Sequence, residues 1–199
     1  DTTNPPGNES EAARYLAGVL RREGLEPLCT ESAPGRGNVT ARLRGGTAPP
    51  LLLLGHTDVV GCEPEQWTHP PFGGEMHGGC IWGRGALGMK NMVAAELMVV
   101  LLLARQGLRL NRDVLFAATA DEEAGRGNHG IGWLLDHHPE QVDAPLVLTE
   151  GGGSDLRVGA QRFYTCQTGQ KGICRLRVRA RGRPGPASRV LLVDDEEVV

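Results

Sequence analysis

Short apolar runs recur along the chain, and acidic or imidazole side chains follow three of them. These runs occupy residues 50–54, 114–120 and 145–149. They are apolar at successive positions rather than at alternate ones, which is typical of strands buried on both faces of a parallel sheet. The pattern therefore predicts three central strands whose ends carry polar side chains.

Amphipathic patterns with a helical period lie between the apolar runs. Apolar residues spaced three or four apart predict a helix over 11–23, with Ser10 as its N-cap and Gly24 as its stop. Two further helices are expected over 89–106 and 128–138, because the same spacing recurs there. Helices thus alternate with the predicted strands.

Two segments that alternate between polar and apolar residues, 38–44 and 171–180, are expected to be strands. Segment 61–79 is rich in proline and glycine and has no period, so we interpret it as a long loop. The order of elements predicts an α/β fold, a three-layer α/β/α sandwich with a mixed, mostly parallel sheet. We expect one domain over 1–168 and the start of a small α+β domain over 169–199.

Composition narrows the class of protein without identifying it. The 199 residues are 40% hydrophobic and 23% charged, with a net charge of −3. These values are ordinary for a soluble protein and give no reason to expect nucleic acid or a membrane as partner. The five cysteines lack CxxC spacing, which predicts reduced thiols in a cytoplasmic protein. We expect no signal peptide and no membrane-spanning segment.

The side chains that follow the three central strands are of the types that bind a divalent metal ion. They are His56 and Asp58 after the first strand, Asp121, Glu122 and Glu123 after the second, and Glu150 after the third. Because the carboxyl ends of parallel strands meet at one edge of a sheet, these groups are expected to converge. One imidazole among carboxylates favours zinc, with Asp58 orienting His56. The structural alternative is an α/β domain whose acidic loops are only solvated.

Six segments resemble, in order and spacing, the dinuclear zinc amidohydrolases and exopeptidases that include aminoacylase, glutamate carboxypeptidase and succinyl-diaminopimelate desuccinylase (metallopeptidase family twenty). The segments are GHTDVV (55–60), WTHPPF (67–72), IWGRGALGMK (81–90), DEEAGRG (121–127), TEGG (149–152) and KGICRLRVRARGRPGPAS (171–188). The resemblance implies a zinc-exopeptidase-like fold, in which 1–168 is the N-terminal part of the metal-binding catalytic domain and 169–199 begins a lid or dimerisation domain. It also implies a metallopeptidase, aminoacylase-like or carboxypeptidase-like, that acts on a small peptide or an N-acyl amino acid.

The resemblance also implies roles for single residues. His56 and Glu150 match ligands of one zinc ion, and Glu123 matches a ligand of a second. Asp58 matches the carboxylate that orients His56, and Glu122 matches the general base. The implied reaction is cleavage of an amide bond by a metal-activated water. Zn²⁺ is the implied cofactor, with Co²⁺ or Mn²⁺ as substitutes.

Departures from the family pattern bear on activity. Gly88 stands where the family has an aspartate that bridges two zinc ions, so at most one ion is expected. Pro186 stands where the family has a histidine that reaches a neighbouring subunit, and a homodimer is left open. The family's last zinc-binding histidine lies farther downstream, so we expect a truncated N-terminal portion whose tail after about 188 is off-pattern. The alternative function is a catalytically inactive remnant or a binding-only module of the same fold.

The other histidines and the aromatic residues of the long loop receive ordinary structural interpretations. His69, His77 and His129 are expected to be loop residues. Trp67, Phe72 and Trp82 are expected to pack the long loop against the sheet. A substrate-facing role for this loop is left open, because the loop follows one of the central strands.

Overall fold

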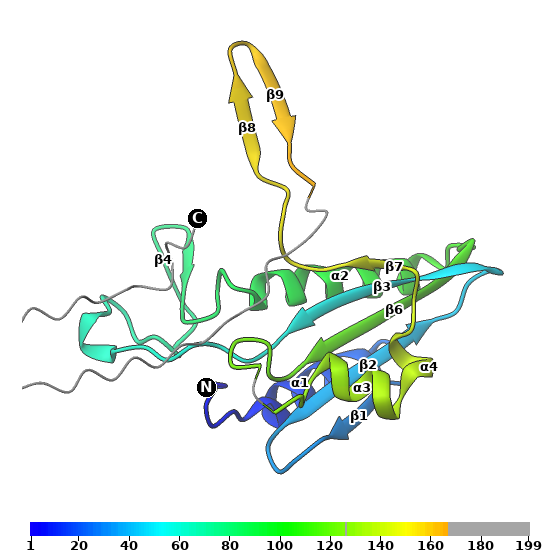
Figure 1. Ribbon diagram of the computed structural model, residues 1–199, viewed down its shortest axis with the longest axis horizontal. Coiled ribbons are helices and arrows are strands. Elements are labelled where there is room, and N and C mark those ends of the chain that lie inside the picture. The colour runs from blue at the N-terminus through cyan, green and yellow to red at the C-terminus, as the bar shows by residue number, and fades with distance from the viewer. Residues whose placement is uncertain (126, 167–199) are drawn as a thin grey trace, which may run out of the picture. The chain divides into compact units, whose positions relative to one another are not determined.

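The run of four leucines lies in the middle of a sheet in the computed structural model, which describes residues 1–125 and 127–166. Strand β3 (Ala48–His56) lies between β6 (Arg112–Thr119) and β7 (Leu146–Leu148) and runs parallel to both. The carboxyl ends of the three strands therefore lie at the same edge of the sheet (Figure 1). The prediction of three parallel strands is confirmed, but β7 is not central: it lies at the edge of the described sheet, and its side chains are about half exposed because no described strand pairs with its other side.

Antiparallel strands extend the described sheet beyond β6. Strand β2 (Gly37–Leu43) pairs with β6, and β1 (Leu28–Glu31) pairs with β2, which gives the order β1-β2-β6-β3-β7. The sheet is mixed, as predicted, and its parallel part carries the candidate site. Strand β1 was not predicted, because four mostly exposed residues at a sheet edge show too little periodicity.

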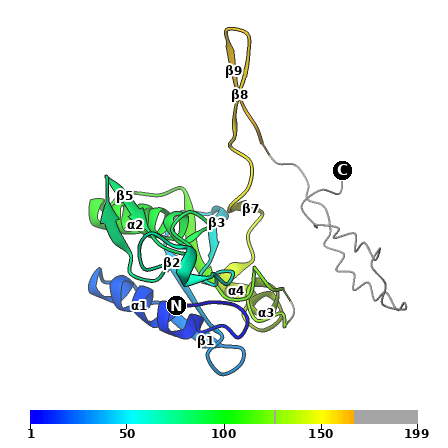
Figure 2. The same ribbon diagram turned by 90° about the vertical axis from the view of Figure 1, so that its left-hand side faces the viewer.

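Helices cover both faces of this sheet. Helices α1 (Glu9–Arg22) and α2 (Lys90–Gln106) pack on one face, and α3 (Ile131–His137) and α4 (Pro139–Val142) pack on the other. Figure 2 shows the two pairs of helices on opposite sides of the strands. This arrangement is the predicted three-layer sandwich.

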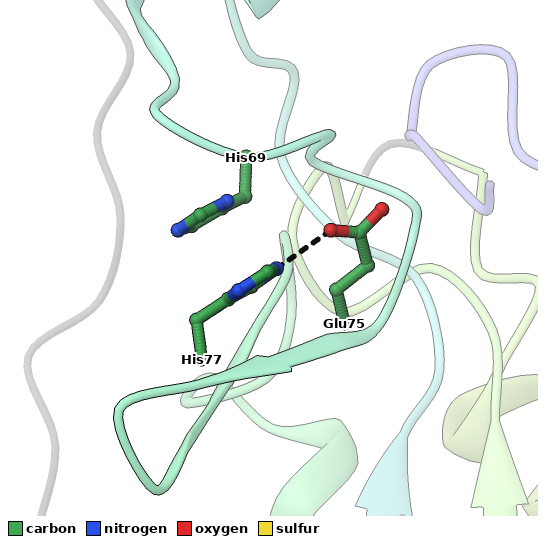
Figure 3. Close-up of side chains that lie close together, drawn as sticks. All are labelled: His69, Glu75 and His77. Atoms are coloured by element: carbon green, nitrogen blue, oxygen red, sulfur yellow. Dashed lines mark hydrogen bonds and ion pairs between the residues drawn. The ribbon is translucent and has the colours of Figure 1, made fainter.

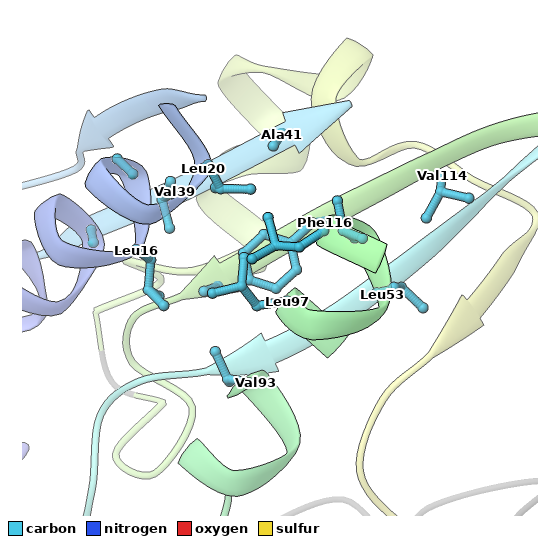
Figure 4. Packing of buried hydrophobic residues seen from close by; sticks show 14 of the residues in the cluster. Leu16, Leu20, Val39, Ala41, Leu53, Val93, Leu97, Val114 and Phe116 are labelled. Atoms are coloured by element: carbon cyan, nitrogen blue, oxygen red, sulfur yellow. The ribbon is translucent and has the colours of Figure 1, made fainter. Parts of the chain in front are cut away.

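Neighbouring residues of the central strands supply the two layers of the core. Leu53 and Phe116 belong to the larger layer, beneath α1 and α2 (Figure 4). Leu52 and Leu115 belong to the smaller layer, against Leu134 of α3. Successive side chains of a strand point to opposite faces, so a strand covered by helices on both sides must be apolar throughout. This requirement explains why the runs over β3 and β6 do not alternate.

Helix α1 begins at Glu9, earlier than predicted, and Ser10 is not its N-cap. Ser10 lies inside the first turn, and its hydroxyl donates a hydrogen bond to the carboxylate of Glu31 on β1. The helix packs directly on the sheet here, since a Cβ atom added at Gly37 would come within 2.5 Å of Ser10 Cα. The Ser10 hydroxyl, which the local sequence predicts to cap the helix, therefore forms a tertiary hydrogen bond to β1 instead.

The segment interpreted as a long loop contains regular structure. A 3₁₀ turn spans Pro64–Gln66, and β4 (Glu75–His77) and β5 (Cys80–Trp82) form an antiparallel hairpin. Each of these elements has three residues, which is too few to establish a period in the sequence.

Residues Asp1–Gly151 form one unit, and Gly152–Val199 form another. In the described part of the second unit, β8 (Asp155–Val158) and β9 (Gln161–Tyr164) form an antiparallel hairpin. The strand predicted over 171–180, the boundary expected after residue 168 and Pro186 lie outside the described residues. None of the described helices combines the length and the apolar character needed to span a bilayer.

Candidate metal centre

The ends of the three parallel strands bring candidate ligands together. His56 is the last residue of β3 and pairs with Thr119 at the end of β6. Glu122 follows β6, and Glu150 follows β7, after short connections. His56 Nε2 lies 3.6 Å from Glu122 Oε2 and 3.4 Å from Glu150 Oε1. One imidazole and two carboxylates thus meet at this edge of the sheet.

Asp58 holds the other side of the His56 ring. His56 Nδ1 lies 3.2 Å from Asp58 Oδ1 and 3.0 Å from the Asp58 backbone oxygen. The His56 side chain is 4% exposed and that of Asp58 is fully buried. A proton on Nδ1 that is shared with these oxygens keeps Nε2 facing the two glutamates, where its lone pair becomes available to a metal ion once the Nε2 proton is lost. This is the arrangement by which carboxylates orient metal-binding imidazoles.

Asp58 is itself held by hydrogen bonds from distant segments. Its Oδ1 accepts the N–H of Glu122 at 3.1 Å, and its Oδ2 accepts the N–H of Glu123 at 3.0 Å. The side-chain amide of Asn4 also donates to Oδ2 at 2.8 Å. Burial by itself raises the pKa of Asp58, but the hydrogen bonds from His56, Asn4 and the Glu122 backbone outweigh it and lower the pKa. Asp58 is therefore an anion that ties the acidic loop to β3.

Asp121, which the sequence marked only as part of an acidic cluster, supports the same loop. Its Oδ1 accepts the Asn4 amide at 3.0 Å and lies 3.1 Å from Arg36 Nη2. Its Oδ2 accepts the backbone N–H groups of Gly127 and His129 at 3.0 and 3.3 Å. Sequence reasoning missed Asn4 and Arg36, which lie 117 and 85 positions from Asp121. Asn4 stands beside two prolines, which signals a turn rather than a site.

The site concentrates negative charge around one imidazole. Burial by itself lowers the pKa of His56, but the hydrogen bond and charge of Asp58, with the charges of Glu122 and Glu150, raise it to about 9. Burial, together with Glu150 and Asp58, raises the pKa of Glu122 against the opposing effect of His56. Both shifts reflect carboxylates crowded around a single base, a charge imbalance that a bound cation would relieve.

Glu123 is not part of the group of ligand atoms from His56, Glu122 and Glu150, which lie within 4.8 Å of one another. Glu123 lines a neighbouring cavity of about 420 Å³ together with Gly88. Gly88 contributes no side chain, and a Cβ atom added there would meet no atom within 4 Å. The cavity therefore has room for a side chain at the position where the family pattern has aspartate.

Comparison with known proteins identifies the family of the chain. The model of peptidase family M20/M25/M40 matches residues 52–197. Succinyl-diaminopimelate desuccinylase of Paracoccus denitrificans is 37% identical over 187 residues, which cover 91% of this chain and 46% of that protein. The probable carboxypeptidase S-like 2 of Dictyostelium discoideum is 46% identical over 105 residues, which cover 51% of this chain and 20% of that protein. The chain thus spans about half the length, or less, of these curated relatives.

Solved structures share the fold. An M20 family metallo-carboxypeptidase from Sulfolobus solfataricus has a TM-score of 0.62 at 22% identity, covering 76% of this chain and 35% of that chain. Human carnosine dipeptidase 1 has a TM-score of 0.57 at 20% identity, covering 70% of this chain and 32% of that chain. At these identities the likeness bears on the fold alone. The match of the family model to well over half of the sequence shows that the chain belongs to peptidase family M20/M25/M40.

Proposed function

We propose that the chain is the metal-binding part of a zinc-dependent hydrolase that cleaves an amide bond of a peptide or an N-acyl amino acid. The observation that carries this proposal is the 3.4 Å between His56 Nε2 and Glu150 Oε1 at the ends of adjacent parallel strands. Two ligands of tetrahedral zinc, with bonds of about 2.1 Å, lie about 3.4 Å apart. His56 and Glu150 therefore already have the spacing of zinc ligands and would hold the ion.

The donor set favours zinc over magnesium or calcium. An imidazole nitrogen with carboxylate oxygens is typical of zinc, and Co²⁺ or Mn²⁺ can use the same ligands, whereas magnesium and calcium prefer oxygen alone. The side chains of Glu122 and Glu150 are 50% and 42% exposed, so the site is open to solvent on their side. When bound, the ion would polarise the amide carbonyl and make a water molecule more acidic.

Glu122 is proposed as the general base and acid. Its carboxylate lies 3.6 Å from His56 Nε2, so it reaches the space in which the ligands converge. Burial, then the neighbouring carboxylates, raise the pKa of Glu122, which brings it closer to the range suited to proton transfer near neutral pH. Glu122 Oε2 would take a proton from the attacking water and pass it to the leaving amine nitrogen. Asp58 would keep the His56 ring in position.

Relatives guide the choice of substrates to test. They carry the names succinyl-diaminopimelate desuccinylase and probable carboxypeptidase S-like 2. These names support N-acyl amino acids, N-succinyl compounds first among them, and peptides with a free carboxyl end as the substrate classes of this chain.

Gly88 favours a second candidate function, a binding-only protein of the same fold. Two divalent ions about 3.5–4 Å apart are normally bridged by an anionic ligand. Gly88 supplies no such ligand to the cavity that it lines with Glu123. This candidate predicts one zinc ion at His56 without turnover.

Zinc content and hydrolysis, measured on the same preparations of the full chain, test these proposals. Glu122→Gln should keep the zinc and lose hydrolysis, because it removes the proton acceptor and keeps the shape. His56→Ala should lower the zinc content by one equivalent. Zinc binding without hydrolysis of any N-acyl amino acid or dipeptide would support the binding-only candidate. A folded chain whose zinc content does not depend on His56 would refute both.

A further inference from the structure

A second group of metal-binding side chains lies at hairpin β4–β5 and shares no residue with the site described above. One ring nitrogen of His69, one of His77 and a carboxylate oxygen of Glu75 lie within 4.8 Å of one another. The two imidazole rings are stacked, with centroids 3.7 Å apart and planes inclined by 3°. His77 Nε2 lies 2.7 Å from Glu75 Oε2. Figure 3 shows the three side chains gathered beside the hairpin.

The turn of the hairpin determines which side chains lie beside His77. Gly78 and Gly79 join the strands with φ angles of +60° and +78°, as a two-residue type I′ turn requires. This turn sets the register in which His77 pairs with Cys80. Directly paired residues of antiparallel strands project from the same face, and so does Glu75, two residues before His77. A thiol, an imidazole and a carboxylate therefore share one face of the hairpin.

Trp82 connects the loop residue His69 to this face. The Trp82 and His69 rings meet edge to face, with centroids 4.8 Å apart, and the Trp82 indole N–H donates to the His77 carbonyl at 3.3 Å. The side chains of His77 and Glu75 remain 43% and 45% exposed. An ion in solution can therefore reach a cluster whose members come from two segments, the loop before the hairpin and the hairpin itself.

We propose that His69, Glu75 and His77 form a second divalent-metal site, and that the exposed thiol of Cys80, which lies outside this group in the ion-free structure, rotates toward it as a fourth ligand. Two imidazoles, a carboxylate and a thiolate are ligands of zinc and of the neighbouring transition metals, and a thiolate excludes magnesium and calcium as preferred ions. Ligand atoms around tetrahedral zinc lie about 3.4 Å apart, so atoms at the 4.8 Å limit must approach by up to about 1.4 Å. The stacked rings of His69 and His77 must also tilt apart, because lone pairs in parallel ring planes cannot converge on one ion. Glu75 and His77 are exposed and His69 is half-buried, so the movement requires mainly rotation of the two hairpin side chains.

Such an ion would fasten the loop that carries His69 to the hairpin. The same stretch of chain continues from Trp82 to Gly83 and Arg84, which line the cavity beside Glu123. The second site would therefore stabilise one wall of that cavity. This inference does not depend on the proposed hydrolase activity, because it uses none of the residues at His56.

Zinc binding to the full chain carrying His56→Ala tests the second site apart from the first. One equivalent of zinc should still bind in calorimetric titrations. Losing a residue that merely orients a ligand costs about 10- to 100-fold in metal affinity, so His77→Ala, which removes a ligand, should cost at least about 100-fold. The matched control is His137→Ala, which removes an exposed imidazole that is stacked on the Trp133 ring and lies outside the cluster. This control should leave zinc affinity unchanged.

Cobalt substitution identifies the ligands directly. In the same His56→Ala background, bound Co²⁺ should show a thiolate-to-metal charge-transfer band that disappears in Cys80→Ser. An unchanged spectrum in Cys80→Ser would contradict the assignment of Cys80.

Two results would overturn the whole site in chains whose circular dichroism shows a retained fold. One is zinc binding no tighter than about 1 mM in the His56→Ala background. The other is binding that persists unchanged after both His69→Ala and His77→Ala. A wild-type chain that binds zinc only at the hairpin would instead refute the site at His56.

Discussion

Glu96 is a carboxylate buried between helix α2 and the sheet, and its ionisation is expected to cost stability. The residue is 4% exposed, and neither carboxylate oxygen has a hydrogen-bond partner within the described part of the chain. A Cβ atom added at Gly55 would lie 3.5 Å from Glu96 Oε2, so the carboxylate packs against the end of β3. Burial raises the pKa of Glu96 from 4.5 to about 7.

The sign and size of the effect follow from the two pKa values of Glu96. Below pH 4.5 the carboxyl is protonated in the folded and unfolded chains alike, so it does not affect the free energy of unfolding. Between pH 4.5 and about 7 the unfolded chain releases the proton while the folded chain keeps it, and the free energy of unfolding falls as pH rises. Above about pH 7 the loss is complete. At about 1.4 kcal/mol per pKa unit, the full loss is about 3 kcal/mol.

Glu96→Met removes the titrating group and nearly conserves the side-chain volume. The resulting gain in the free energy of unfolding should be about 2 to 3 kcal/mol larger at pH 8 than at pH 5. Urea denaturation of both chains at the two pH values, in the presence of a chelator, measures this difference. The control is Glu26→Met at an exposed position, which measures the effect of the same substitution without burial.

Equal gains from Glu96→Met at pH 5 and pH 8 would refute the reasoning, because they would mean that the folded chain ionises Glu96 as readily as the unfolded chain does. Glu96→Gln separates charge from packing. The amide does not titrate, so its stability relative to wild type should show the same pH dependence even if the absolute gain is smaller than that of methionine.

Four further predictions concern the candidate metal centre. Asp58→Asn keeps the shape but removes the charge that orients the imidazole, so zinc affinity in calorimetric titration should fall about 10- to 100-fold; an unchanged affinity would contradict the orienting role. Asn4→Ala removes a donor to two buried carboxylates and should lower the free energy of unfolding in urea by about 1–3 kcal/mol. Gly88→Asp meets no steric obstacle, so it should fold normally and add one zinc equivalent in mass spectra of the intact protein. In the zinc-free chain, an NMR titration of His56 should have its midpoint near pH 9. Because the folded chain favours the protonated ring, the stability that His56 contributes should be complete below pH 6.5 and lost as pH rises through about 9.

The central strands β3 and β6 could be predicted from the sequence because burial on both faces requires a short run that is apolar at successive positions. A run of residues apolar on both faces, such as 51–54, is stable in water only when other elements cover both sides. The rule that parallel strands end at one edge of the sheet then predicts that His56, Glu122 and Glu150 lie near one another, as they do in the structure. Helix α2 likewise ends at Gln106, as the helix predicted over 89–106 does, and the next residue, Gly107, adopts the left-handed conformation with φ 58°.

The hydrogen bonds that support the site correspond to no pattern in the local sequence. Asn4 reaches Asp58 and Asp121 across 54 and 117 positions, and no spacing rule relates residues so far apart. The side chain of Ser10 could cap a helix or form a hydrogen bond with a neighbouring strand. Because α1 packs on the sheet, the hydroxyl of Ser10 bonds to Glu31 on β1.

A feature of this protein can therefore be predicted from the sequence when its stabilising free energy comes from burial of a short segment. It cannot be predicted when that free energy comes from contacts between distant segments. The sequence by itself determined the buried strands β3 and β6 and the residues that follow them, because burial constrains every position of a short segment. Only the tertiary structure decided which side chains support Asp58 and which meet at His69 and His77. Those contacts depend on how separate segments pack, and a hydrogen bond or a stacked ring selects its partner only after the backbone has brought the two together.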